Sequence, residues 1–277
     1  MITPHIIIRW GFQEHLIYSL TQSLFMGNTV ILITDSINEY KNNFSYKLNK
    51  IEFIDIDEFS LRANNFEKYY EHYSTNPKWF ELRCLQRWFV LLDFLTKNSV
   101  DGFLYTDCDV LFFGLVLEEI KKIENYNVGL GSLSGAGVML SGSIFYLKVY
   151  IKLLEDSYIN KSGCYSHIIK YAKEFEERKL DGGISDMMFF DFINESRRDL
   201  KVLSLSDVII NNEIYDKNLS ESEKFLKIDN RKRVEFEGEI PYFLTKHYEK
   251  IYTKTLHCSA VNKRLMKDLT SPCLRDL

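Results

Sequence analysis

The sequence predicts an α/β fold in which a mixed, mostly parallel sheet is flanked by helices. Two continuous apolar runs, His5–Arg9 and Thr29–Thr34, have the length and β-branched content of buried strands, and a helical apolar stripe lies between them. The same order returns with a predicted helix at Trp79–Leu95 and a predicted strand at Phe103–Thr106. Because parallel strands need a crossover connection, this alternation favours a parallel sheet with helices on its faces.

The first helix is predicted from apolar residues at every fourth position, which are Phe12, Leu16, Leu20 and Leu24. Gly27-Asn28 ends this helix, and Asp35-Ser36 closes the strand that follows it. A third strand is expected at Ile51–Ile54. The next stretch, Asp55–Tyr73, is charged and aromatic without a regular period, and we expect it to form a flap over a cleft.

The α/β alternation continues through the middle of the chain. We expect a strand at Val138–Leu140 and helices at Ser143–Glu155, Tyr165–Arg178 and Ser185–Ile193. Asp207–Lys246 is polar and irregular, and its charged run Arg231-Lys232-Arg233 fits either a small subdomain or a long surface excursion. A last strand, Ile251–Leu256, ends at His257.

Composition narrows the class of protein. A chain of 277 residues with 45% hydrophobic residues can form one large α/β domain. Its net charge of −4 argues against binding nucleic acid along the phosphate backbone. The 5 cysteines are odd in number and lack CxxC spacing, so we expect neither a disulfide framework nor a zinc site. Without a long apolar run or a secretory leader, we expect a cytoplasmic protein with no integral membrane span, and peripheral membrane contact stays open.

Two acidic residues, Asp107 and Asp109, follow the strand at Phe103–Thr106. In an extended segment their side chains project to the same side, while Cys108 points the other way. Paired carboxylates suit Mg²⁺ or Mn²⁺, which keep further coordination positions for phosphate oxygens and water. The sequence therefore indicates a divalent-cation site that binds a diphosphate. The alternative is that both residues only solvate a turn at the end of the strand.

The segment Leu104–Phe113, LYTDCDVLFF, resembles the metal-binding motif of GT-A glycosyltransferases. The resemblance covers roughly residues 5–200 and the region of His257, and it leaves residues 207–246 unmatched. It implies a Rossmann-like nucleotide-diphospho-sugar transferase fold and a single catalytic domain over residues 1–277. In that domain, residues 1–130 would form the nucleotide and metal half, 131–206 the acceptor-side half, and 207–277 an irregular segment with a C-terminal metal ligand.

The resemblance also implies roles for residues outside this motif. Arg87 occupies the helix position from which an arginine of this superfamily often reaches the nucleotide, and Gly137 lies in a small-residue strand, Gly135–Leu140, that lines the sugar pocket. His257 corresponds to the third metal ligand of retaining transferases of family 8, and imidazole suits manganese. For each residue the alternative is structural: a surface arginine, a packed strand, or a histidine bonded to backbone.

Four positions near the N-terminus are candidates for binding the nucleoside. Arg9 and Trp10 lie where the first strand of such folds meets the nucleoside, and Trp10 or Phe12 would stack on uracil. Asp35, after the second strand, would accept a hydrogen bond from the ribose or the base, although acidic turn residues are common without function.

In the predicted mechanism a bound cation neutralises charge on the leaving nucleoside diphosphate. Arg87 and a basic residue near the C-terminus, Lys263 or Arg264, add positive potential there. Asp186, which follows the glycine turn in DGGISD, is the candidate catalytic residue. It would be the general base of an inverting enzyme, or would position the acceptor in a retaining one, and the stereochemistry stays open.

The expected partners are a nucleotide-sugar donor, with a UDP-sugar favoured, and a glycan, lipid-linked or protein acceptor of a hexosyltransferase-type enzyme. Two alternatives remain. The segment YTDCDVLF also resembles the nucleophile loop of haloacid-dehalogenase-like phosphatases, although two strands and a helix precede it where that loop normally closes the first strand. The other alternative is a non-catalytic module that binds a nucleotide-sugar without turnover.

Overall fold

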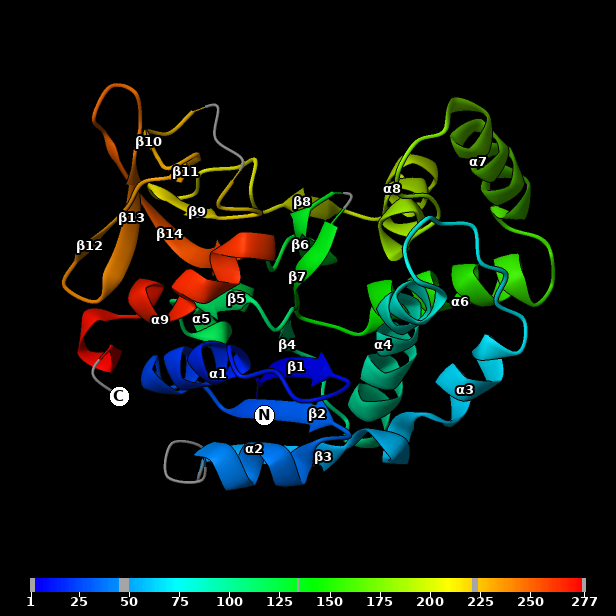
Figure 1. The fold of residues 1–277 in the computed structure, drawn as a ribbon, viewed down its shortest axis with the longest axis horizontal. Coiled ribbons are helices and arrows are strands. Elements are labelled where there is room, and N and C mark those ends of the chain that lie inside the picture. The colour runs from blue at the N-terminus through cyan, green and yellow to red at the C-terminus, as the bar shows by residue number, and fades with distance from the viewer. Residues whose placement is uncertain (1–2, 45–49, 134, 221–223, 276–277) are drawn as a thin grey trace.

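The computed structural model describes residues 3–44, 50–133, 135–220 and 224–275. Within these ranges the chain forms a seven-stranded sheet, a five-stranded sheet and a two-stranded ribbon (Figure 1). Its helices gather around the larger sheet, and the smaller sheet lies beside one end of it. The active-site candidates lie where the two sheets meet, so the junction between them is the part of the fold that matters for function.

The seven-stranded sheet confirms the predicted fold class. Its strand order is β3-β2-β1-β4-β7-β6-β8. The strands are β1 (His5–Arg9), β2 (Val30–Thr34), β3 (Ile51–Asp55), β4 (Phe103–Thr106), β6 (Val128–Ser132), β7 (Gly135–Ser141) and β8 (Val202–Ser204). Only β7 runs against the others, because it pairs antiparallel with both β4 and β6 while the remaining pairs are parallel. The sheet is therefore mixed and mostly parallel.

Helices cover both faces of this sheet, as the alternation of side chains along its strands requires. Ile6 and Ile8 of β1 point into one apolar cluster, while Ile7 between them points into another. The first cluster is completed by α3 (Leu61–Glu67), α4 (Lys78–Lys97), α6 (Phe145–Tyr158) and α8 (Asp186–Ser196). The opposite face is covered by α1 (Leu16–Phe25), α2 (Ile37–Phe44) and α5 (Val116–Lys122). Helix α7 (Tyr165–Arg178), which has the predicted bounds, lies at the edge of the molecule in Figure 1.

The stretch expected to be a flap belongs to the body of the fold. It forms a short 3₁₀ helix, Ile56–Phe59, and α3, and both pack against α4. Phe59 and Phe66 are buried there and contact Phe94 and Phe89. These two aromatic side chains of the expected flap are thus core residues. No helix in the described ranges is long and apolar enough to cross a membrane.

Much of the polar region 207–246 is also ordered into strands, where we expected irregular chain. It supplies β9 (Glu213–Tyr215), β10 (Lys227–Ile228), β11 (Arg231–Lys232), β12 (Val234–Glu237) and β13 (Ile240–Leu244). Residues 221–223 of this region lie outside the described ranges. With β14 (Lys250–His257) and β5 (Val110–Phe112), strands β9, β12 and β13 build the five-stranded sheet. One face of this sheet is apolar and buried, because Ile214, Phe243 and Leu256 lie in one buried cluster.

Candidate metal centre and active-site cleft

A cleft of about 1160 Å³ opens beyond the carboxyl ends of β1 and β4. Ligand sites of open α/β sheets occur at this edge. The described residues that line the cleft include most of the sequence-predicted site residues: Arg9, Trp10, Arg87, Asp107, Asp109, Gly137, Asp186, His257 and Lys263. The candidates Phe12, Asp35 and Arg264 are not among them. Residues from distant parts of the chain therefore converge on one cavity.

The two acidic residues of the motif occupy the connection between the sheets. Strand β4 ends at Thr106, and β5 begins at Val110 in the other sheet. The Asp107 N–H donates to Gly137 O at 2.9 Å, and the Val110 N–H donates to Asp107 O at 3.3 Å, which closes a tight turn. Cys108 is buried on the far side, where its carbonyl accepts from Ser19 Oγ at 3.0 Å. The turn is thus fixed from both sides.

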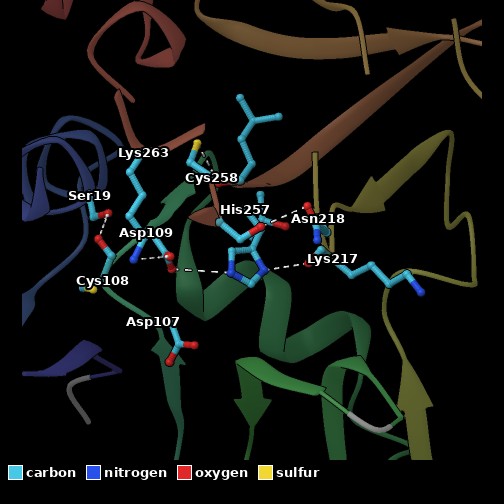
Figure 2. A network of polar contacts seen from close by, with 12 residues as sticks. Ser19, Asp107, Cys108, Asp109, Lys217, Asn218, His257, Cys258 and Lys263 are labelled. Carbon is cyan, nitrogen blue, oxygen red and sulfur yellow. Dashed lines mark hydrogen bonds and ion pairs between the residues drawn. The ribbon is translucent and has the colours of Figure 1, made fainter. Parts of the chain in front are cut away.

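Pairing of β14 with β5 brings the histidine to the acids. In this antiparallel ladder His257 is opposite Val110, and the Cys258 N–H donates to Asp109 O at 2.8 Å. One ligand atom from each of Asp107, Asp109 and His257 lies within 4.8 Å of the other two (Figure 2). The grouping follows from strand register, so it does not depend on the rotamer of one long side chain.

The donor set fits a divalent cation. His257 Nδ1 is 2.6 Å from Lys217 O, and a carbonyl can only accept, so Nδ1 carries the hydrogen. The other ring nitrogen, Nε2, faces Asp109 Oδ1 at 3.4 Å. A histidine that ligates metal usually donates its second N–H to a carbonyl or carboxylate in this way. Two carboxylates and an oriented imidazole are ligands that Mn²⁺ accepts, and the oxygens suit Mg²⁺ as well.

Opposing effects set the charges at this cluster. Burial raises the pKa of Asp107 despite the nearby Arg87 charge. Burial also favours the neutral form of Asp109, but the hydrogen bonds and charges of His257 and Lys263 outweigh it and lower the pKa of Asp109 below its usual range. Burial alone would lower the pKa of His257, but the hydrogen bond and the charge of Asp109 outweigh burial and raise the pKa to about 9. Lys263 Nζ lies 3.1 Å from Asp109 Oδ2. Cationic groups thus balance the carboxylates when no metal is present.

Arg87 of α4 joins the motif to the start of α8. Its Nη1 lies 2.5 Å from Asp107 Oδ1, and its Nη2 lies 2.6 Å from Asp186 Oδ2. Tyr105 OH also donates to Asp107 Oδ1, at 3.0 Å. The guanidinium is a fixed fork with two partners, and the side chain is only 14% exposed. The structure therefore places Arg87 inside the site, and not on a helix surface.

Asp186 lies in the cleft but is already engaged. It is the first residue of α8, after Ser185 at the N-cap, and it is 4% exposed. Besides Arg87, Trp88 Nε1 donates to its Oδ2 at 3.2 Å. A carboxylate held by two donors is well placed to orient neighbouring groups, and its role as a general base stays a prediction.

Gly137 contributes space to the metal centre. A Cβ at this position would lie 2.9 Å from His257 Cε1, closer than packed carbon atoms approach, and 3.7 Å from Asp107 Oδ2. A glycine on β7 is thus what allows the imidazole to lie against the strand. We had expected Gly137 to line the sugar pocket; the structure adds this direct contact with the histidine.

The N-terminal candidates separate into two groups. Trp10 lines the cleft, and the Arg83 guanidinium lies 4.6 Å from its ring centroid. Phe12 instead packs on Tyr40, with ring centroids 4.9 Å apart. Asp35 accepts from the Gly11 N–H at 2.7 Å, and neither Phe12 nor Asp35 is among the described residues of the lining. Asp35 supports the turn after β1, where Gly11 has a φ of 73°.

The cleft also contains residues that the sequence did not single out. Arg83 lies one helical turn before Arg87, and Lys217 and Asn218 come from the region expected to be irregular. Asp191 of α8 lines the cavity too; burial and the charge of Glu195 raise its pKa. The helical spacing of Arg83 from Arg87 was a signal that would have identified it, whereas no local pattern identifies Lys217 or Asn218. The outer wall is rich in aromatic residues, which are Trp79, Phe80, Tyr171, Phe175 and Phe192.

Comparisons with known proteins give structural likeness only. No protein-family model matches the chain, and no curated protein matches its sequence. Mouse xyloside xylosyltransferase 1 in its apo form is a similar solved structure, 12% identical with a TM-score of 0.47, covering 73% of this chain and 85% of that one. The glycosyltransferase GlyE of Streptococcus pneumoniae TIGR4 is another, 17% identical with a TM-score of 0.39, covering 75% of this chain and 46% of GlyE. This chain therefore spans less than half of GlyE, and both similar proteins are glycosyltransferases.

Proposed function

We propose that this chain is a GT-A-type glycosyltransferase that moves a sugar from a nucleoside-diphosphate donor, with a UDP-sugar favoured, to a carbohydrate, lipid-linked or protein acceptor. One observation carries the proposal: Asp107, Asp109 and His257 converge at the base of a large cleft at the carboxyl ends of parallel strands. A divalent cation held by these three residues would neutralise charge on the diphosphate as the bond to the sugar breaks.

The chain's own cationic groups complete this role. Lys263 is 3.1 Å from Asp109, and Arg87 is held against Asp107, so both project positive charge into the part of the cleft where a diphosphate would bind. Charges fixed before the reaction stabilise a developing anion without a cost of reorganisation. The arrangement therefore suits a reaction in which a phosphate group is the leaving group.

We assign the donor and the acceptor to different ends of the cleft. Trp10 and Arg9 would bind the nucleoside, which makes residues 1–130 the nucleotide and metal half. The aromatic wall and α8 would bind the acceptor, on the side of residues 131–206. Asp186 would be the general base of an inverting enzyme, or would orient the reacting groups through Arg87 in a retaining one. Asp191 is a second carboxylate on this wall and the other candidate for the base.

A thermal-shift panel of nucleoside diphosphates and nucleotide-sugars tests the donor site. A ligand at a hundred times its Kd stabilises the folded state by about 2.7 kcal/mol, and each kcal/mol raises Tm by about 2–4 °C in proteins of roughly this size. We expect such a shift for one donor with Mn²⁺ or Mg²⁺ and a much smaller one with chelator. Asp109→Asn should remove the metal-dependent part, while the matched control Asp199→Asn, on an exposed ion pair, should keep it.

Turnover separates this proposal from its alternatives. A glycosyltransferase releases nucleoside diphosphate from the stabilising donor, slowly to water and faster to an acceptor. A binding module would show the thermal shift without release. A phosphatase would instead hydrolyse an aryl phosphate and gain nothing from a nucleotide-sugar. If no donor shifts Tm in a metal-dependent way, the proposal is wrong.

A further inference from the structure

A buried ion pair lies behind the metal centre, on the side away from the cleft. Lys232 and Asp216 form a short ion pair, and the two residues are 6% and 2% exposed. Lys232 is the central residue of the charged run at 231–233, for which the sequence left both a small subdomain and a surface excursion open. Its ammonium lies 5.3 Å from the ring centroid of Phe243 and 5.9 Å from that of Phe225. The lysine thus points inward, into the core of the smaller sheet.

This pair fixes the segment that holds the histidine. Asp216 Oδ2 accepts from the His257 N–H at 3.0 Å, and Lys232 Nζ donates to Asn218 O at 3.0 Å. Between these two residues, Lys217 O accepts from His257 Nδ1 at 2.6 Å (Figure 2). One ammonium therefore anchors both ends of the segment 216–218, whose middle carbonyl binds the imidazole.

We propose that Lys232 and Asp216 are positioning residues of the metal centre, which act through the backbone of residues 216–218 to aim His257 Nε2 at Asp109. This inference rests on the cation site of the proposed function. Without Lys232, Asn218 O loses its donor and Asp216 loses its counter-charge, so the Lys217 carbonyl is held less firmly, although Thr255 Oγ1 still donates to Asp216 O at 3.1 Å. The hydrogen bond that sets the ring orientation and the tautomer of His257 is then weakened.

Stability alone is a poor explanation for this pair. Removing two charges from water costs several kcal/mol per ion, and apolar residues of the same volume are often equally stabilising or better. The two phenylalanine rings around Lys232 could pack against an apolar side chain. What an apolar residue cannot do is donate hydrogen bonds to Asp216 and to Asn218 O at the same time.

The test is Lys232→Met, which keeps the length of the side chain and removes the donor. We expect its affinity for Mn²⁺, measured from the free Mn²⁺ signal in electron paramagnetic resonance, to fall about 10–100-fold, the usual cost of losing an outer partner of a metal ligand. Lys232→Arg retains charge and donors and should restore most of the affinity.

Lys254→Met is the matched control. Lys254 is on the same strand as His257, its side chain is 14% exposed, and it pairs with Glu213 at 2.7 Å and Glu119 at 3.6 Å. Its loss should lower the Tm in the way the loss of Lys232 does, yet leave Mn²⁺ affinity within about twofold, because in the positioning model only the bonds to 216–218 matter. Equal losses of affinity in both variants would mean that general loosening of the sheet is the cause, and would overturn the inference.

A single unpaired charge in the core can prevent folding, so a second variant is needed. Asp216→Asn/Lys232→Met removes both charges, keeps an oxygen for the His257 N–H, and still deprives Asn218 O of its donor. It should fold and show the same fall in Mn²⁺ affinity. Wild-type affinity in either folded variant refutes the positioning role and leaves the proposed function standing, whereas absence of Mn²⁺ binding by the wild-type chain, with or without UDP, refutes the cation site itself.

Discussion

Arg87 offers the sharpest test of how the site is assembled. Arg87→Met preserves the length and apolar stem of the side chain but removes its bonds to Asp107 and Asp186. The two carboxylates differ in their surroundings, because the Asp107 side chain is 25% exposed and the Asp186 side chain only 6%. Removal of the guanidinium should therefore destabilise the folded state mainly by leaving the buried carboxylate of Asp186 without a counter-charge.

The expected magnitude follows from that difference. Breaking a buried ion pair by removing one partner costs about 3–5 kcal/mol, because the remaining charge stays uncompensated. A solvent-exposed pair contributes about 0–1 kcal/mol, and Asp107 lies closer to that limit. We therefore expect Arg87→Met to lower the free energy of unfolding by about 4 kcal/mol. Adding Asp186→Asn removes the stranded charge and should recover about half of this loss.

Urea denaturation of wild type, both single variants and the double variant measures these quantities, provided that the m-value stays constant. The double-mutant cycle gives the coupling between Arg87 and Asp186, expected at about 2–3 kcal/mol. If Arg87→Met costs less than about 1 kcal/mol, or if the double variant is as unstable as Arg87→Met, then an unpaired buried carboxylate is not what Arg87 prevents.

Four further outcomes follow from the geometry. Asp109→Asn should abolish the Mn²⁺-dependent part of UDP affinity in calorimetry, whereas His257→Ala should weaken it less, because a neutral ligand contributes no net charge. Gly137→Ala should lower Mn²⁺ affinity about tenfold with little loss of stability, because its Cβ displaces the imidazole and not the core. Asp186→Asn should slow sugar transfer by about 10²–10⁴-fold if it is a general base, and by less if it only orients Arg87, while donor affinity stays nearly unchanged. Burial lowers the pKa of His5 from 6.5 to about 3, so the folded state binds fewer protons than the unfolded state between these values; stability is lost as the pH falls below 6.5, by about 2 kcal/mol at pH 5, and His5→Gln should flatten that slope in urea titrations.

Specific results would contradict these predictions. Unchanged UDP affinity in Asp109→Asn would remove the metal assignment, and wild-type Mn²⁺ affinity in Gly137→Ala would show that the imidazole tolerates displacement. Full transfer per folded molecule in Asp186→Asn would leave that residue a structural one. An unaltered pH slope in His5→Gln would mean that other groups account for acid sensitivity.

The sequence predicted the larger sheet because its central strands are long, apolar and β-branched. Val30–Thr34 and Phe103–Thr106 are buried on both faces, so every residue of these strands contributes to the signal. In the smaller sheet only β14 was predicted, at Ile251–Leu256, and its partners escaped prediction for the opposite reason. Its strand β12 is half-buried, β9 and β5 have three residues each, and strands so short carry no recognisable period.

The residues of the candidate site also divide into those with a local sequence signal and those without one. Asp107 and Asp109 could be proposed as metal ligands because both lie in one local motif, and His257 could be proposed only through the resemblance of the sequence to a family. Lys217 reaches the site with its backbone carbonyl, which any residue type would provide. Lys232 resembled a surface lysine because its neighbours Arg231 and Arg233 are basic, and only tertiary packing shows that its side chain is buried.

The position of the proposed metal ligands at the connection of two sheets has a mechanical consequence. Asp107 follows β4 of one sheet and His257 ends β14 of the other, so a shared ion would act as a clasp between segments far apart in the chain. The closing of a clasp and the docking of the parts it joins are reciprocal: each favours the other by the same free energy. Binding of a cation at the proposed site would therefore stabilise the C-terminal strands, and a partner that binds those strands would raise the affinity for the cation.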